Sequence, residues 1–180
     1  PEINPQALHQ IFTFWAPLTP NTIFNDIYEV PPGHYLTLKD GKTEVKKYWQ
    51  LNFSQNRNKS LNQALEEFNE LIYDSIRLRL RSDVPVAAYL SGGIDSTATT
   101  RFIKDIQPHN LQSFSIGFED NQYDETAFQD EASRFLDTTH KRFTCRNDDI
   151  AHNFSKIIWH TEVPVIRTAP APMYFLSRLV

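Results

Sequence analysis

The segment YLSGGIDS (residues 89–96) follows the small apolar run VPVAA and leads into STATTRFIKDI (residues 96–106), which has a helical pattern. Two of the five glycines of the chain, Gly92 and Gly93, lie side by side in this segment. Adjacent glycines permit backbone angles that other residues avoid, and they leave no side chain in the way of a ligand. An apolar strand, a Gly-Gly turn and a helix are typical of a β–α unit in a parallel sheet that is covered on both faces.

The segments after this turn continue to alternate between strand and helix. The pattern predicts strands over 111–118 and 140–145 and helices over 124–136 and 148–160. We therefore predict an α/β fold with a parallel sheet and right-handed crossovers, in which ligands bind at the carboxyl ends of the strands. The apolar residues expected to face inward from these two helices are Phe128, Ala132, Phe135, Leu136, Ile150, Phe154, Ile157 and Ile158.

The chain before the sheet is different in character. Residues 1–53 are rich in aromatics and prolines and contain short strand-like pieces, and residues 34–51 predict a hairpin around Asp40-Gly41. The polar segment 52–60 predicts a linker. A helix is expected to begin at Ser60, with Gln63 completing a capping box. Its predicted buried face consists of Leu61, Leu65, Phe68, Ile72 and Ile76.

The composition and charge of the chain indicate which partners and which cellular location to expect. The net charge of −4 over 180 residues gives no broad basic field, so nucleic acid is not an expected partner. No apolar run has the length of a membrane span, and the first residues lack a signal-peptide pattern. The single cysteine favours a reducing compartment, and we expect a cytoplasmic protein. Because the chain starts without methionine and ends in the helix-like segment 171–180, we expect it to be part of a longer polypeptide.

The Ser-Gly-Gly turn predicts a phosphate site. Main-chain N–H groups of the turn and of the helix start can form a cradle for anions, and Ser91 and Ser96 add hydroxyl donors. Asp95 would repel a phosphate unless a cation lies between them, and Mg²⁺ accepts oxygen ligands from both. The spacing matches neither the Walker A loop nor the dinucleotide motif. The alternative is a tight turn whose helix is capped by Asp95 or Ser96, and the complete string SGGIDS favours the phosphate site.

The motif SGGIDS resembles the pyrophosphate-binding motif of the PP-loop ATP pyrophosphatases. The flanking segments IRLRLRSDVPVAAYLSGGIDSTA, SFSIGFEDNQYDETAFQDEASRFLDTTH and IIWHTEVPV resemble the synthetase domain of the glutamine-hydrolysing asparagine synthetases. Residues 1–53 are similar to the β-rich C-terminal portion of that family's glutaminase domain. Residues 54–180 are similar to the N-terminal portion of its ATP-binding domain. The resemblance covers nearly the whole chain in the family's order.

This resemblance implies an ATP-dependent amide ligase that uses ATP and Mg²⁺. In the family, the β-carboxylate of aspartate attacks the α-phosphorus of ATP to give β-aspartyl-AMP and pyrophosphate. Ammonia released from glutamine then displaces AMP and yields asparagine. The implied partners are therefore small molecules, with no nucleic acid and no membrane, and the full-length protein is expected to be capable of forming a homodimer. The implied nucleotide-binding residues are Leu90, Ser91, Gly92, Gly93, Asp95, Ser96 and Ile116, with Asp95 near the metal.

Several features depart from the family pattern. The family's glutaminase nucleophile is an N-terminal cysteine, whereas this chain begins with Pro1, and Cys145 is expected to be a core or strand residue. The second ATP-site loop would lie beyond residue 180, so we expect no complete reaction from this piece alone. TEVPV (residues 161–165) stands where the family has D-E-P, and RTAPAP (residues 167–172) also differs.

These departures leave alternatives open. One is a related synthetase that acts on another carboxylate acceptor, such as a β-lactam-forming enzyme or an amidotransferase with a different acceptor. The other is a nucleotide-binding module without catalysis, against which the intact Asp95 and Ser96 argue. Asp124 and Glu125 are expected mainly to stabilise the start of their helix.

Overall fold

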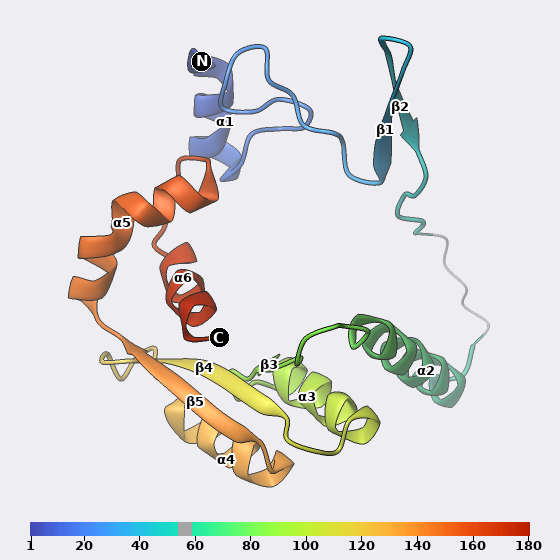
Figure 1. The fold of residues 1–180 in the computed structure, drawn as a ribbon, viewed down its shortest axis with the longest axis vertical. Coiled ribbons are helices and arrows are strands. Elements are labelled where there is room, and N and C mark those ends of the chain that lie inside the picture. Colours follow the sequence, from blue (N-terminus) through green and yellow to red (C-terminus); the bar gives the residue numbers. More distant parts are fainter. Residues whose placement is uncertain (54–58) are drawn as a thin grey trace. The chain divides into compact units, whose positions relative to one another are not determined.

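The computed structural model describes residues 1–53 and 59–180 (Figure 1). The chain divides into two compact units, one made of Pro1–Asn56 with Ser155–Thr168 and the other of Arg57–Phe154 with Ala169–Val180. Most of the predicted linker, residues 54–58, lies outside the described residues. Within the described ranges, no helix combines the length and the apolar character that crossing a membrane requires.

The larger unit contains the predicted parallel sheet. Its strands are β3 (Ala88–Tyr89), β4 (Gln112–Phe118) and β5 (Thr139–Cys145), in the order β3-β4-β5. Both strand pairs are parallel. Helices α3 (Ile94–Ile106) and α4 (Thr126–Leu136) alternate with these strands along the chain, as Figure 1 shows. The predicted α/β fold is therefore confirmed, and the loops after β3 and β4 share the carboxyl edge of the sheet.

Helices cover both faces of β4 and β5. Helix α6 (Pro170–Leu179) contacts both strands, and Phe143 stacks on Phe175 with 5.1 Å between ring centroids. Arg142, the preceding residue of β5, instead bonds to helix α4, so α4 and α6 lie on opposite faces. A separate apolar cluster joins α2 (Leu61–Arg79), β3 and α3 and contains Ile76, Leu80, Ala88, Ile103 and Leu111.

Helix α2 begins as predicted but buries less than predicted. The Ser60 hydroxyl accepts from the Gln63 N–H, and the Gln63 side chain accepts from the Ser60 N–H, so the capping box is present. The predicted buried face is wrong over most of its length. Leu61, Leu65 and Phe68 are exposed, and burial is confined to the C-terminal part of the helix, where Ile76 joins the cluster with Ile103 of α3. A helical repeat specifies an apolar face but not the element that covers it.

Helix α4 shows the same partial agreement. Ala132 and Leu136 are buried against Leu90, as predicted. Phe128 and Phe135, which were expected on the same inward side, are exposed. The four positions form one apolar stripe, but the buried side of α4 is shifted round the helix toward Gln129 and Ser133, which leaves the two phenylalanines exposed at the other edge of the stripe.

The other unit contains the predicted hairpin and an unpredicted helix. Strands β1 (His34–Lys39) and β2 (Lys42–Lys47) pair antiparallel around Asp40 and Gly41, whose φ angles are 51° and 72°. Helix α1 (Pro5–Phe14) begins after Asn4, whose side chain accepts from two main-chain N–H groups. The last turns of α5 (Asn147–Thr161) also belong to this unit, and Ile157 of α5 is buried.

Candidate functional site

The Ser91–Gly93 turn lies at the carboxyl end of β3. The N–H of Leu90 donates to the carbonyl of Phe114 on β4 at 2.9 Å, so the strand pairing extends to the residue before the turn. Helix α3 starts directly after Gly93. This placement is the one at which parallel α/β sheets hold ligands.

Gly92 fits this turn for two independent reasons. Its φ of +82° lies in the left-handed region, where residues with a side chain are strained. A Cβ added there would lie 2.7 Å from the main-chain nitrogen of Gln129 and 2.7 Å from the carbonyl carbon of Phe128. The turn therefore packs directly on the backbone of α4, which fixes where its N–H groups stand.

Gly93 leaves the start of α3 open. It is the N-cap residue, and no side chain caps the helix. The alternative in which Asp95 or Ser96 caps α3 is therefore not what the structure shows. The first N–H groups of a helix have no intrahelical partner, and they carry the positive end of the helix dipole. A Cβ on Gly93 would meet only the Ser91 hydroxyl, at 3.4 Å, so the space around these groups is uncrowded.

The two serines of the motif bond to each other and to the turn. Their hydroxyl oxygens lie 2.8 Å apart, and the Ser96 hydroxyl donates to the Gly93 carbonyl at 3.1 Å. The Ser91 N–H donates to the Ser96 hydroxyl, and the Gly93 N–H donates to the Ser91 hydroxyl. These bonds hold the turn in shape without a ligand. Either hydroxyl would have to exchange a partner to donate to a phosphate.

Asp95 occupies the first turn of α3 and is exposed. Across residues 1–53 and 59–180, no group of three or more His, Cys, Asp or Glu side chains is placed to hold a metal ion. A cation beside Asp95 would thus take its remaining oxygen ligands from water and from a bound ligand, which is the usual situation of Mg²⁺ in nucleotide sites. The carboxylate fits that role, and the open helix start fits a phosphate.

The structure brings all the predicted binding residues to one edge of the sheet. Leu90 and Ile116 lie near the ends of adjacent strands, beside the turn. Leu90 is only 1% exposed and packs on Ala132 and Leu136, so its side chain belongs to the core and does not face a ligand. The carbonyl of Ile116 accepts from the side chain of Gln129 at 2.8 Å.

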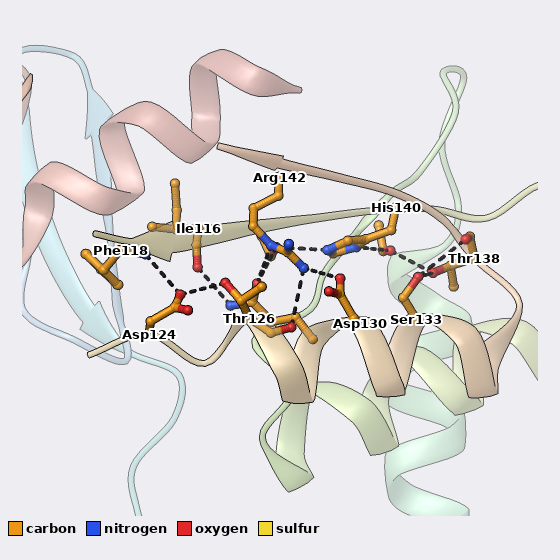
Figure 2. A network of polar contacts seen from close by, with 12 residues as sticks. Ile116, Phe118, Asp124, Thr126, Asp130, Ser133, Thr138, His140 and Arg142 are labelled. Atoms are coloured by element: carbon orange, nitrogen blue, oxygen red, sulfur yellow. Dashed lines mark hydrogen bonds and ion pairs between the residues drawn. The ribbon is translucent and has the colours of Figure 1, made fainter. Parts of the chain in front are cut away.

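Behind this edge lies a polar network that the sequence prediction missed (Figure 2). Ser115 of β4 and His140 of β5 meet at 2.9 Å, and Ser115 donates to the Gln129 side chain of α4 at 2.8 Å. Arg142 donates to the same Gln129 oxygen at 2.9 Å and pairs with Asp130. Figure 2 shows Arg142 and His140 pointing from β5 toward α4. A detectable signal was the spacing of Ser113, Ser115 and Gly117, which places small residues on one face of an otherwise apolar strand.

The donors and acceptors of this network are fixed by counting protons. Arg142 can only donate, so the Gln129 atom that it contacts is the oxygen, and the amide nitrogen must face the Ile116 carbonyl. Ser115 gives its single proton to Gln129 and therefore accepts from Nε2–H of His140. Burial, followed by the positive charge of Arg142, lowers the pKa of His140, which agrees with a neutral ring.

Asp124 organises the end of β4. Its Oδ1 accepts from the Thr126 hydroxyl at 2.6 Å and from the Phe118 N–H at 3.2 Å. These bonds, the Thr126 hydroxyl first, lower the pKa of the Asp124 carboxyl. Gly117 lies beside this contact, and a Cβ there would approach Thr126 and Arg142 to 3.1 Å. The Asp124 carboxylate thus has a structural role at the start of α4, whereas Glu125 is the N-cap residue and its side chain makes no capping hydrogen bond.

Cys145 is a buried strand residue, as predicted. It ends β5 with 2% of its surface exposed, and burial, followed by the charge of Asp149, raises the pKa of its thiol. Both effects disfavour the reactive thiolate, so the thiol is unsuited to act as a nucleophile.

We expect the Cys145 thiol to be alkylated slowly in the folded protein. At pH 8, iodoacetamide labelling followed by peptide mass spectrometry should be about tenfold or more slower than in urea, because only the accessible thiolate reacts. Equal rates in the folded and unfolded protein would contradict the buried placement.

The segment TEVPV (residues 161–165) begins at Thr161, the last residue of α5. Glu162 has a φ of 57°, and its N–H donates to the Ile158 carbonyl at 3.1 Å. Five residues later, the Arg167 guanidinium lies 3.4 Å from the ring centroid of Trp15, within the same compact unit. Cation–π stacking of this kind holds the segment after α5 on the region of α1.

Comparison with protein families gives two matches. The family described as asparagine synthase matches residues 67–180. The family described as glutamine amidotransferase domain matches residues 1–49.

Individual relatives match over most of the chain. The chain is 32% identical over 178 residues to glutamine-hydrolyzing asparagine synthetase 1 of Bacillus subtilis (strain 168), covering 98% of this chain and 28% of that protein. It is 26% identical over 192 residues to glutamine-hydrolyzing asparagine synthetase 3 of the same organism, covering 98% and 31%. It is 28% identical over 162 residues to amidase chyE of Penicillium rubens, covering 80% and 24%. The chain therefore spans between 24% and 31% of the length of these relatives.

Proposed function

Because the chain belongs to the asparagine synthase family, we propose that it contributes the phosphate-binding part of an ATP-dependent amide ligase. The observation that carries the proposal is the packing of Gly92 on α4, which presents the turn and the uncapped start of α3 at the carboxyl edge of the sheet. Such an edge suits the tail of a nucleoside triphosphate.

In this proposal each residue of the motif has a separate task. Main-chain N–H groups around Gly92 and Gly93 hold the phosphates, and the Asp95 carboxylate holds Mg²⁺ against them. Mg²⁺ supplies positive charge where negative charge grows on the departing pyrophosphate. Leu90 and Ile116 lie near the ends of the two adjacent strands that border the space for the nucleoside. Because the serine hydroxyls bond within the turn, their first task is to keep it rigid, and fixed dipoles stabilise developing charge better than mobile ones.

The full reaction that we propose is the amidation of aspartate. The β-carboxylate oxygen bonds to the α-phosphorus of ATP as the bond to pyrophosphate breaks, which gives β-aspartyl-AMP. Ammonia from glutamine hydrolysis then forms the C–N bond, loses a proton and expels AMP. The two family matches, at residues 1–49 and 67–180, support a glutaminase portion over 1–53 and a synthetase portion over 54–180. The relatives named asparagine synthetase support this choice of acceptor.

A second candidate is the amidation of a different carboxylate. The relative named amidase chyE favours keeping this option, since it matches 80% of the chain. The phosphate site would serve both reactions equally, because the acceptor is chosen elsewhere. A module without catalysis is disfavoured by the exposed carboxylate of Asp95 beside an open helix start.

ATP–pyrophosphate exchange in the full-length protein tests the proposal. With Mg²⁺, we expect aspartate to raise the exchange rate about tenfold or more over the rate without acceptor, because exchange requires reversible formation of the acyl-adenylate. Exchange that another carboxylic acid supports and aspartate does not would select the second candidate. Failure of the full-length protein to bind MgATP would refute both.

A further inference from the structure

Gln129 joins the two strands of the proposed site. It is 2% exposed, and its main-chain nitrogen lies so close to Gly92 that a Cβ added to Gly92 would approach it to 2.7 Å. Its side-chain nitrogen donates to the Ile116 carbonyl at 2.8 Å, which places that carbonyl at the end of the adjacent strand. One buried residue therefore contacts both the turn after β3 and the end of β4.

The side chain of Gln129 is itself held from two sides. Arg142 and Ser115 both donate to its oxygen, at 2.9 Å and 2.8 Å, so the amide cannot rotate to exchange its oxygen and nitrogen. Arg142 is anchored in turn by its ion pair with Asp130, one residue further along α4. A buried amide that is hydrogen-bonded at both its oxygen and its nitrogen keeps a single orientation, and this holds the groups bonded to it in place.

We infer that Gln129 is a positioning residue for the nucleotide, through the fixed spacing between the Gly92 turn and the Ile116 main chain. The inference rests on the proposed function and extends it to a residue outside the SGGIDS motif. Gln129 touches no phosphate. It sets the distance between the phosphate end and the nucleoside end of the site.

The test compares three variants of the full-length protein. Gln129→Ala removes every side-chain contact. Gln129→Glu keeps the acceptor for Arg142 and Ser115, but it replaces the donor to Ile116 with a carboxylate oxygen that repels the Ile116 carbonyl. Ser133→Ala is the matched control, since Ser133 lies four residues further along α4, is 8% exposed and bonds to Thr138 at 2.9 Å, away from Gly92 and Ile116.

We expect the Kd for MgATP, measured by calorimetry, to rise about tenfold in both Gln129 variants and to stay within about twofold in Ser133→Ala. Without nucleotide, hydrogen exchange of peptides covering residues 91–97 and 116–118 should be faster in both Gln129 variants than in the wild type and Ser133→Ala. A purely structural role would give Gln129→Glu and Ser133→Ala the same Kd, and that result would overturn the inference.

The two measurements separate the inference from the function on which it rests. If the wild type fails to bind MgATP, the proposed function is refuted. The role of Gln129 in positioning a nucleotide is then refuted as well, even if hydrogen exchange shows that Gln129 orders the turn. If the wild type binds MgATP and both Gln129 variants bind it equally well with unchanged exchange, the inference alone is refuted.

Discussion

Replacing Asp95 with alanine is expected to lower Mg²⁺-dependent ATP–pyrophosphate exchange in the full-length protein by about a hundredfold or more. Asp95 is the carboxylate of the motif, and it stands in the first turn of α3, beside the open N–H groups. Without it, Mg²⁺ would lose its protein ligand next to the phosphates. The Mg²⁺ concentration that gives half-maximal exchange should rise together with the fall in rate.

The same substitution should change stability only slightly. Asp95 is exposed, and its removal costs the favourable interaction with the helix dipole, about 0.3–1 kcal/mol. Asp105→Ala is the matched control, because Asp105 is a second carboxylate on α3, pairs with Arg101 at 3.0 Å and lies near the other end of the helix. Exchange in Asp105→Ala should stay within about twofold of the wild type. An Asp95→Ala protein with wild-type exchange and wild-type Mg²⁺ dependence would remove the metal-binding role.

The sheet and its turn could be predicted because their signals are local. The apolar run before Ser91, the glycine pair and the following helix pattern lie within a few residues of one another, and each favours the same β–α unit. The hairpin at Asp40-Gly41 is of the same kind, since the turn residues supply the positive φ angles that the structure shows. The sequence prediction did not include helix α1, although Asn4 and Pro5 form a helix start of the favoured type.

Burial and the polar network could not be predicted because they depend on partners far away in the sequence. The apolar repeat of α2 indicated a covered face, yet only its C-terminal turns meet α3 and β3. The network depends on contacts between Ser115 and residues 14 and 25 positions later, Gln129 and His140. The residues next to Ser115 in the sequence do not indicate that Gln129 and His140 face it. The sequence predicts a strand over 111–118, but the contacts of the small polar residues on one of its faces depend on α4.

Substituting alanine for Gly92 is expected to damage both stability and nucleotide binding. The left-handed φ of +82° costs a residue with a side chain about 1–2 kcal/mol. The added Cβ would also approach the backbone of α4 to 2.7 Å, and relief of such overpacking costs about 1–3 kcal/mol more. Together these terms are a large share of the stability of a typical domain, about 5–15 kcal/mol. Pushing the turn off α4 displaces the N–H groups, so we expect the Kd for MgATP to rise about a hundredfold or more.

Alanine substitutions at two other glycines separate the effect of the positive φ from the effect of the close contact with α4, which makes the Gly92 experiment decisive. Gly41→Ala shares the positive φ, at +72°, but its Cβ would meet nothing within 4 Å, so it should lose about 1 kcal/mol and leave MgATP binding unchanged. Gly93→Ala has neither the strained φ nor a contact closer than 3.4 Å, so its melting temperature should stay near that of the wild type. Its new methyl group would stand beside the phosphate cradle, and a weaker affinity for MgATP without loss of stability would locate the ligand there. A phosphate held by these N–H groups could not tolerate both changes. If Gly93→Ala and Gly92→Ala both bind MgATP as the wild type does, the turn has a structural role and does not bind the phosphates.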